Sequence, residues 1–195
     1  FGEDDFEDYE TGDLTEQSCH WSMWTPSSTN DAIVQGSWNK YLKIKRQAYA
    51  TSANQPDILL NVNNAAPVHH VNFKMWVPSN RSATFNLQKN LSFENTSNEI
   101  GAGFFFNPDG TGYVLVNGRS TYFDYTPDSW MRIYLDIHNQ EDNVVGFYIN
   151  DRLVAEFPAN WNMYSAYGSN QLEAINFFPH RTDGLFYLND VSVLD

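Results

Sequence analysis

The segment Trp130-Met131-Arg132-Ile133-Tyr134-Leu135-Asp136-Ile137 decides the fold class, because its side chains alternate between two kinds. One set consists of Trp130, Arg132, Tyr134 and Asp136, and the other consists of Met131, Ile133, Leu135 and Ile137. Successive side chains of a β-strand point to opposite faces of the sheet. The segment is therefore predicted to be a strand whose aliphatic set faces the core, while the set that begins with Trp130 forms a candidate exposed face.

Short runs of this kind recur along the chain, and helical periodicity is almost absent. The expected strands cover residues 21–24, 38–47, 57–61, 68–77, 83–88, 99–106, 112–116, 120–125, 130–138, 144–149, 152–157, 173–178 and 184–193. Asn117-Gly118 and Asn150-Asp151 supply residues that tolerate positive φ, which hairpin turns require. Many short strands joined by such turns predict an all-β fold, a single antiparallel β-sandwich domain of two sheets that spans residues 1–195.

Composition excludes several classes of protein. The 195 residues carry a formal net charge of −13 and only 11 Lys and Arg, so no nucleic-acid partner is expected, because phosphate binding requires a basic surface. Cys19 is the only cysteine, so no intrachain disulfide can form. No run of about 18 apolar residues is present, and no membrane insertion is expected. Because Phe1 is not an initiator methionine, we expect a processed chain that is secreted or at the cell surface.

The N-terminal segment is strongly acidic. Residues 1–16 contain eight Asp and Glu side chains, and no Lys or Arg precedes Lys40. Crowded like charges cost free energy unless a cation or solvent compensates them. A second acidic strand pattern lies near the other end of the chain, at residues 186–193. Together the two patterns indicate a calcium-stapled sandwich, and the alternative is that the carboxylates lie on exposed edges of terminal strands.

Several short motifs of the chain resemble a known group of domains. They are Asp5-Phe6-Glu7-Asp8-Tyr9, the Trp-x-x-Trp pair at Trp21 and Trp24, the segments 75–79, 85–88, 130–136, 147–151 and 175–179, Trp161, and Asn189-Asp190-Val191. Through these motifs nearly the whole chain resembles the concanavalin A-like (laminin-G-like) jelly-roll domains of secreted Bacteroidetes proteins. Such domains commonly accompany a type IX secretion sorting signal, and similar terminal motifs occur in carbohydrate-binding modules and in MAM-type adhesion domains. The resemblance implies a jelly-roll fold.

The resemblance also implies where a structural calcium ion would be held. In related jelly rolls the ion is bound by the Glu of an N-terminal Phe-Glu motif and by an acidic residue of a C-terminal Asp-Asp-Val motif. These residues correspond to Glu7 and Asp190 here. Asn189 replaces the first Asp of the second motif, so it keeps an oxygen ligand but loses a charge. Asp5 and Glu3 are further candidates, and backbone carbonyls would complete the oxygen ligands that calcium requires.

Catalytic signatures are not found in the sequence. Glycoside hydrolases and polysaccharide lyases share this fold, but the Glu-x-Asp-x-x-Glu strand motif of laminarinase-like hydrolases is missing. The Gln-x-His motif of alginate lyases is missing too, and Asp136-Ile137-His138 is interpreted as a strand end that enters a polar turn. His69 and His70 are adjacent in an expected strand and point to opposite faces, so they cannot chelate a transition metal together. We therefore expect no enzymatic activity.

Two groups of aromatic residues are candidate carbohydrate-binding sites, because sugar rings stack on aromatic faces while amides and charged groups bond their hydroxyls. The residues are Trp161, Tyr164 and Tyr167 in an expected loop at 160–170, and Trp130, Arg132 and Tyr134 on the exposed strand face. Each group has a plainer interpretation, as a loop folded over the sandwich edge or as a solvated face with a routine ion pair. The tryptophans at positions 21, 24, 38 and 76 are interpreted as mostly structural.

These observations favour a non-catalytic, secreted carbohydrate-binding module that contains a structural calcium and binds an extracellular polysaccharide or glycan. An alternative of nearly equal weight is an adhesion or accessory domain that contacts a protein, such as a secreted protease or a cell-surface partner. A third possibility is a polysaccharide lyase or hydrolase with an unrecognised site. Because sites rather than folds determine function, the fold alone does not choose among the three.

Overall fold

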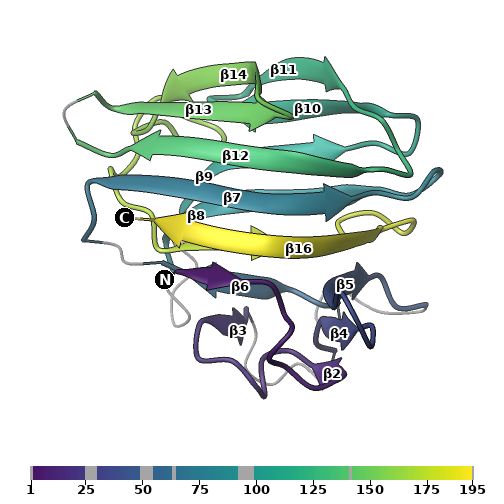
Figure 1. The fold of residues 1–195 in the computed structure, drawn as a ribbon. Coiled ribbons are helices and arrows are strands. Elements are labelled where there is room, and N and C mark those ends of the chain that lie inside the picture. The colour runs from purple at the N-terminus through teal and green to yellow at the C-terminus, as the bar shows by residue number, and fades with distance from the viewer. Residues whose placement is uncertain are drawn as a thin grey trace.

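Figure 1 shows the computed structural model of the chain, in which two antiparallel β-sheets lie face to face. The structure describes residues 2–24, 30–48, 55–62, 65–91, 99–140 and 142–194. Within these ranges the chain forms strands and turns, and no helix is long and apolar enough to span a membrane. The expected all-β sandwich of two antiparallel sheets is confirmed.

One sheet has nine strands. They are β1 (Glu3–Asp4), β2 (Gly12–Asp13), β4 (Ile33–Gln35), β5 (Tyr41–Lys45), β7 (Val68–Trp76), β12 (Trp130–His138), β13 (Val144–Ile149), β14 (Arg152–Pro158) and β16 (Leu185–Leu194). Their order is β14-β13-β12-β7-β16-β5-β4-β2, and β1 pairs with β16 beside this path. In Figure 1 this sheet faces the viewer, with β12, β7 and β16 across its middle.

The other sheet has seven strands. They are β3 (Trp21–Met23), β6 (Ile58–Asn61), β8 (Ala83–Asn90), β9 (Glu99–Phe106), β10 (Thr111–Val116), β11 (Arg119–Asp124) and β15 (Ala174–Phe177). Their order is β11-β10-β9-β8-β15-β6-β3. The hairpin that joins β10 and β11 turns at Asn117 and Gly118, which have φ values of 49° and 66°, as the sequence predicts.

Aromatic side chains fill the space between the sheets. The ring of Phe85 in β8 is fully buried. Its centroid lies 4.4 Å from that of Phe104, 5.8 Å from Phe177, 5.3 Å from Phe73 and 6.4 Å from Phe147. Phe73 and Phe147 belong to the nine-stranded sheet, whereas the others belong to the seven-stranded sheet. This cluster therefore joins the two layers through ring contacts in addition to the area that it buries.

The alternation predicted for β12 is confirmed. The aliphatic set that begins with Met131 is buried, and the set that begins with Trp130 faces outward. In β7 the two adjacent histidines also point to opposite faces, because His69 is fully buried and His70 lies on the outer face. The outer face of the nine-stranded sheet therefore carries the Trp130 set of β12 together with His70 of β7.

The N-terminal segment pairs with the C-terminal strand. Glu3 lies opposite Ser192 and Asp4 lies opposite Val191, in antiparallel register. Figure 1 shows the labelled ends of the chain close together beside β16. The strands β2 and β4 were not expected from the sequence, because two or three residues are too few to show an alternating pattern, and β1 covers only the start of the acidic strand pattern at the N-terminus. The strand expected at 38–47 is shorter than predicted, since β5 covers five residues.

Asp4 is the centre of a buried hydrogen-bond cluster in this segment. Its side chain is 8% exposed. Atom Oδ2 accepts hydrogen bonds from Trp21 Nε1 at 3.0 Å and from the Tyr9 hydroxyl at 2.9 Å, and Oδ1 accepts one from the backbone N–H of Phe6 at 3.0 Å. The Phe6 ring is itself buried in the core. One carboxylate thus holds three parts of the N-terminal segment against the sandwich.

Buried polar side chains continue from β8 to β15 and on to Asp57. Asn86 Nδ2 donates to Asn176 Oδ1 at 3.3 Å, and Asn176 Nδ2 donates to Asp57 Oδ1. Burial raises the pKa of Asp57 to about 6, because the charged carboxylate loses solvation, and the hydrogen bond from Asn176 opposes that shift. At pH values between the ordinary pKa of an aspartate and about 6, the folded state therefore keeps a proton on Asp57 that the unfolded state releases.

Asp57→Asn is expected to raise the free energy of unfolding above neutral pH by on the order of 1–2 kcal/mol, because the variant no longer buries a charge. The raised pKa means that the contribution of Asp57 to stability is present at low pH and is lost as the pH rises through about 6. Urea denaturation of both proteins at about pH 4.5 and about pH 7.5 measures this difference. A variant that is equally stabilised at both pH values, or destabilised at the higher pH, would contradict the raised pKa of Asp57.

Candidate functional site

Four aromatic side chains surround a hollow at one end of the outer face of the nine-stranded sheet. The hollow has a volume of about 190 Å³ and is lined by Tyr41, Trp76, Trp130 and Tyr187. Four adjacent strands supply these residues, and Trp76 lies directly opposite both Trp130 and Tyr187 in the sheet register. The Trp76 and Trp130 rings meet edge to face at 5.8 Å, as do Tyr41 and Tyr187 at 5.4 Å. We call this group the aromatic end of the face.

The exposed edges of these rings leave apolar surface in contact with water. Trp130 is 40% exposed, and its ring forms one wall of the hollow. A hollow lined by aromatic rings offers stacking surface to a flat or weakly polar ring, and a polar rim can then orient the bound group. Burial and the neighbouring Tyr41 raise the pKa of Tyr187, so this hydroxyl stays protonated and can donate a hydrogen bond.

Charged groups occupy the middle of the face. Arg132 donates from Nε and Nη2 to Asn72 Oδ1 at 3.3 and 2.9 Å, and from Nη1 to Asp151 Oδ1 at 2.9 Å. Next to this group, Lys74 Nζ lies 2.5 Å from Asp190 Oδ2. Asn72 and Lys74 extend outward from β7 at alternate positions, just as Arg132 does from β12. Both cations are thus held above the sheet by partners on neighbouring elements.

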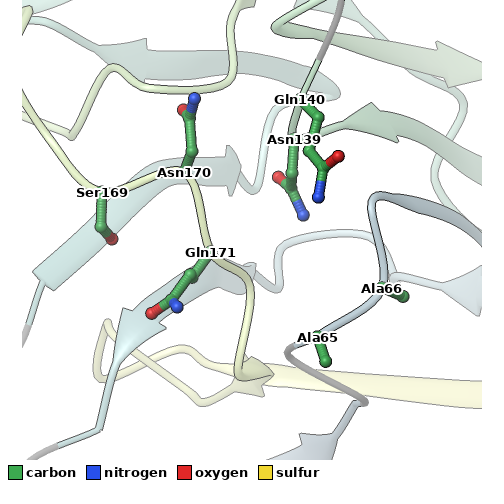
Figure 2. A pocket seen from close by; sticks show the side chains of 7 residues that line it. All are labelled: Ala65, Ala66, Asn139, Gln140, Ser169, Asn170 and Gln171. Carbon is green, nitrogen blue, oxygen red and sulfur yellow. The ribbon is translucent and has the colours of Figure 1, made fainter.

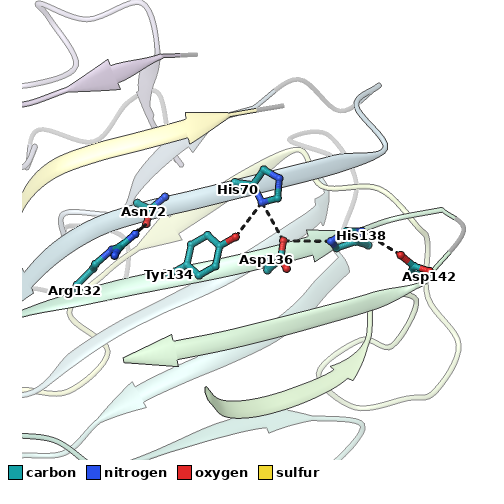
Figure 3. A network of polar contacts seen from close by, with 7 residues as sticks. All are labelled: His70, Asn72, Arg132, Tyr134, Asp136, His138 and Asp142. Atoms are coloured by element: carbon teal, nitrogen blue, oxygen red, sulfur yellow. Dashed lines mark hydrogen bonds and ion pairs between the residues drawn. The ribbon is translucent and has the colours of Figure 1, made fainter. Parts of the chain in front are cut away.

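A network of polar residues forms the other end of the face, as Figure 3 shows. His70 Nδ1 lies 3.0 Å from the Tyr134 hydroxyl and 3.0 Å from Asp136 Oδ1. The same carboxylate oxygen lies 3.2 Å from His138 Nε2, and His138 Nδ1 lies 3.5 Å from Asp142 Oδ2. Burial and the nearby charge of Asp136 raise the pKa of Tyr134. We call this group the polar end of the face.

The strand geometry aligns both ends in one row. Trp130, Arg132, Tyr134, Asp136 and His138 occupy every second position of β12, so the row extends for about 27 Å at the strand rise of about 3.4 Å per residue. Stacking surface lies at one end, and hydrogen-bond donors and acceptors follow along the row. An extended ligand with alternating apolar and hydroxylated surfaces would match this sequence of groups.

The two groups of aromatic residues singled out in the sequence lie in different parts of the molecule. Trp130, Arg132 and Tyr134 lie on the face just described. The 160–170 segment instead bonds to the other sheet, since Met163 N donates to Ile100 O at 2.8 Å and Asn117 N donates to Asn162 O at 2.8 Å. The structure therefore does not combine the two groups into one site.

Within the 160–170 segment the three aromatic residues have different surroundings. Trp161 is partly buried and packs against the core, which agrees with the packing interpretation. Tyr164 and Tyr167 are largely exposed. No ring contact joins these three side chains among the described residues. The segment therefore offers single exposed rings rather than a walled site.

The structural interpretation of the tryptophans needs a correction at two positions. Trp21 is buried as expected, but Trp38 is 86% exposed and Trp76 lines the hollow of the aromatic end. The sequence 75–77 is apolar at each position, so alternation could not show which side chain faces outward. The pairing of β7 with β12 and β16 settles the orientation of Trp76.

The polar end was also missed, although each of its residues lies in an expected strand. In the sequence, Asp136 and His138 were interpreted as a strand end that enters a polar turn. The antiparallel register places His70 directly opposite Asp136, and the His70 and His138 rings lie 6.4 Å apart. A correct pairing of these two strands would have revealed the network, because cross-strand neighbours are side-chain contacts.

The main residues expected to hold calcium have separate partners in the structure. Glu7 Oε1 accepts a hydrogen bond from the backbone N–H of Lys40 at 2.5 Å, and Lys40 Nζ donates to Glu7 O at 2.8 Å. Asp190 is instead paired with Lys74 across the sheet. The Glu7 carboxylate is thus hydrogen-bonded to the backbone of Lys40, and the Asp190 carboxylate forms an ion pair with Lys74.

Two further candidates, Asn189 and Asp5, bond within their own segments. Asn189 Oδ1 accepts from the backbone N–H of Asp190 at 2.8 Å, and Asp5 Oδ1 accepts from that of Glu7 at 3.1 Å. Within the described residues, no group of three or more His, Cys, Asp and Glu side chains is placed to hold a metal ion. Calcium requires about six to eight oxygen ligands, and these side chains, as they are placed, do not converge to supply them. A calcium ion that joins the termini stays a prediction.

Comparisons with known proteins identify the fold. No protein-family model matches the sequence, and no curated protein does. Among solved structures, the alginate lyase Aly36B in complex with an alginate tetrasaccharide is similar over 98% of this chain and 95% of its own, at 12% identity and a TM-score of 0.59. The endo-β-1,4-glucuronan lyase of the fungus Trichoderma reesei is similar over 94% and 92%, at 11% identity and a TM-score of 0.59. The chain has a jelly-roll fold.

A second kind of neighbour belongs to a larger molecule. The binding domain of botulinum neurotoxin serotype G is similar over 91% of this chain at 14% identity and a TM-score of 0.50, but this chain spans only 44% of that domain. At such identities the likeness concerns the fold alone, and function depends on the side chains that each protein places on it. The jelly roll that the resemblance implied is confirmed, whereas an origin among secreted Bacteroidetes proteins stays a prediction.

Proposed function

We propose that the chain is a non-catalytic carbohydrate-binding module and that the outer face of the nine-stranded sheet is its binding site. The observation that carries this proposal is the hollow lined by Tyr41, Trp76, Trp130 and Tyr187, which continues into the polar row of β12. Sugar rings present apolar C–H faces to aromatic side chains and hydroxyls to amides, carboxylates and guanidinium groups. The aromatic end would stack one sugar residue while Arg132, Asn72 and the polar end bond the residues that follow.

The fold neighbours support this proposal without deciding it. One was solved with an alginate tetrasaccharide, and another, from botulinum neurotoxin type C, is described as entering cells through interaction with two ganglioside molecules, at 13% identity and a TM-score of 0.52. Both ligands contain carbohydrate. The partner that we propose here is an extracellular polysaccharide or glycan, and the place of action is outside the cell or at its surface.

Trp130→Ala is expected to weaken binding to the recognised polysaccharide about tenfold or more, which corresponds to about 1.4 kcal/mol of lost stacking. Affinity electrophoresis against a panel of neutral and acidic polysaccharides identifies the ligand, and calorimetry then measures the dissociation constant. Tyr122→Ala removes a ring that is 77% exposed on β11 of the other sheet and serves as the matched control. It should bind like the wild type.

Other outcomes of the same screen would move the site or change the function. Binding that survives Trp130→Ala but is lost in a Tyr164→Ala, Tyr167→Ala double variant would place the site on the 160–170 segment. No retardation by any polysaccharide would sink the carbohydrate proposal. Weight would then move to the adhesion or accessory domain, whose partner is a protein such as a secreted protease.

One observation favours a lyase as a second candidate function. The Tyr134 hydroxyl and His70 Nδ1 lie 3.0 Å apart, and Arg132 with Asn72 lies two positions along the same strands. In a β-elimination on a uronate residue, a base removes the C5 proton, the C4–O bond breaks, an acid protonates the leaving oxygen, and a C4=C5 double bond forms. A cation beside the carboxylate would favour removal of that proton. Release of unsaturated products by the wild type but not by Tyr134→Phe would establish this candidate.

A structural calcium remains part of the proposal on the strength of the family resemblance. Binding at Asp190 would require this carboxylate to exchange Lys74 for the ion, and Glu7 would have to leave the backbone of Lys40. A melting temperature that falls in EDTA, and that calcium but not magnesium restores, would support a bound calcium ion. An unchanged melting temperature would remove it.

A further inference from the structure

A second hollow, larger than that of the aromatic end, lies where β12 runs into the following turn. Its volume is about 550 Å³, and Figure 2 shows its lining. The lining residues are Ala65, Ala66, Asn139, Gln140, Ser169, Asn170 and Gln171. Four of these side chains are amides, one is a hydroxyl, two are methyl groups, and none is charged. We call this hollow the amide pocket.

The polar groups of the amide pocket have unused hydrogen-bonding capacity. Asn139 is 4% exposed, and its Nδ2 atom has no hydrogen-bond partner within the described part of the chain. The same holds for the buried Oγ atom of Ser169. A buried donor or acceptor without a partner costs about 1–3 kcal/mol, so proteins leave such groups where a ligand or water completes them.

The side chains in front of these groups are free to rearrange. Gln140 and Gln171 are exposed, and their amides make no hydrogen bond to any residue that the structure describes. Figure 2 shows the amides of Asn139 and Gln140 directed side by side into the space that faces Ala65 and Ala66. Gln140 lies beside the buried amide of Asn139, so a ligand that moves Gln140 aside reaches that amide.

The backbone of the pocket is fixed, unlike the amides. The Ser169 carbonyl accepts a hydrogen bond from Lys89 Nζ at 2.7 Å, and the Ser169 N–H donates to Glu99 Oε1 at 2.8 Å. On the opposite side, Asn139 N donates to Pro67 O at 2.8 Å. Burial lowers the pKa of Lys89 to about 8, and the charge of Glu99 opposes that shift. Both walls are therefore held in place before any ligand binds, which limits the entropy lost on binding.

We propose that the amide pocket binds an uncharged sugar residue. An amide is a planar group that both donates and accepts hydrogen bonds, which matches the neighbouring hydroxyls of a sugar. The methyl groups of Ala65 and Ala66 offer apolar contact to the C–H groups of the sugar. A uronate residue would lose solvation at its carboxylate and gain no cation from the described lining, because none of the lining residues that the structure describes is charged. This pocket is separate from the aromatic end and does not depend on glycan binding there.

Its position gives the two sites a common border. Gln140 also lines a hollow of about 380 Å³ together with Pro67, Val68, His138 and Asp142. His138 belongs to the polar end of the face. The amide pocket thus lies just beyond the row on β12, and a glycan along that row would reach it with its last residue.

The test uses the whole chain and small sugars as probes. The protein is titrated separately with methyl glucoside, methyl galactoside, methyl mannoside and methyl glucuronoside. NMR follows the side-chain amide signals of Asn139 and Gln140 in each titration. At least one neutral glycoside is expected to shift both signals with a dissociation constant on the order of millimolar, and the glucuronoside should bind at least about fivefold more weakly. No shift with any glycoside, or equal binding of the charged one, would overturn the proposal.

Variants separate the amide pocket from the sheet face. A Gln140→Ala, Asn170→Ala double variant changes only exposed side chains, so it should fold and bind the neutral glycoside about tenfold more weakly. Tyr122→Ala, which changes an exposed ring of the other sheet, should bind it like the wild type. Binding lost with Trp130→Ala and kept by the double variant would place the sugar on the face, refuting the amide pocket while supporting the proposed function. Glycoside binding that the double variant loses, in a chain that no polysaccharide retards, would support the amide pocket while refuting the proposed function.

Discussion

Phe85→Ala is expected to lower the free energy of unfolding by about 3–5 kcal/mol, the largest effect that we predict for a single substitution. The ring lies at the centre of the aromatic core and contacts rings of both sheets, with Phe104 and Phe73 among its neighbours. Truncation removes the apolar area of the ring and leaves a cavity between two sheets that cannot close without moving strands. Neighbouring rings would also lose their stacked and edge-to-face contacts.

Guanidinium denaturation followed by circular dichroism measures this loss, and Tyr122→Ala is the control. The control removes a ring of similar size from the surface of β11, so its effect should stay within about 0.5 kcal/mol. A loss below about 1 kcal/mol in Phe85→Ala would mean that the two sheets repack freely. Such a result would contradict the packing that joins the layers.

Asp4→Ala is expected to lower the free energy of unfolding by about 2–4 kcal/mol, although the residue belongs to a strand of two residues. The substitution leaves Trp21 Nε1, the Tyr9 hydroxyl and the Phe6 N–H without their acceptor. The cost therefore comes from buried donors that lose a charged partner, which exceeds the cost of losing a neutral one.

Asp5→Ala is the control for Asp4→Ala, because the Asp5 side chain is exposed and accepts a hydrogen bond only from the Glu7 N–H. It should change stability by less than about 0.5 kcal/mol. Urea denaturation with and without EDTA measures both variants. Equal losses in the two variants would contradict the specific role of Asp4, because Asp5 does not accept hydrogen bonds from the buried donors.

The sequence was informative where one face of a strand is buried and the strand is long. In β12 the alternation alone placed Met131 inside and Arg132 outside, because nine residues cover several repeats of the pattern. It was uninformative where a strand has two residues, as in β1, or where each position is apolar, as around Trp76. Physically, a local pattern records burial, whereas strand pairing is a relation between distant segments.

The candidate sites divide in the same way. Sequence reasoning found the Trp130 half of the aromatic end but missed Trp76 and Tyr187, which reach it from β7 and β16. It included Ser169 and Asn170 in the candidate loop at 160–170 but did not bring them together with Asn139 and Gln140, which lie about 30 residues earlier in the chain. Short polar residues in turns carry no periodic signal, so their convergence emerges only in three dimensions.

The central place of β16 has a consequence for how the chain is made. This strand joins β7 to β5, and it pairs with segments more than 100 residues earlier in the sequence. On a ribosome, the strands β14-β13-β12-β7, the strands β5-β4-β2 and the strand β1 therefore stay unjoined until residues 185–194 emerge. Until then β7 and β5 each expose an unpaired edge, and such edges attract other extended chains. Joining of the nine-stranded sheet by β16 is consequently slow, at the millisecond-to-second pace typical of non-local β pairing.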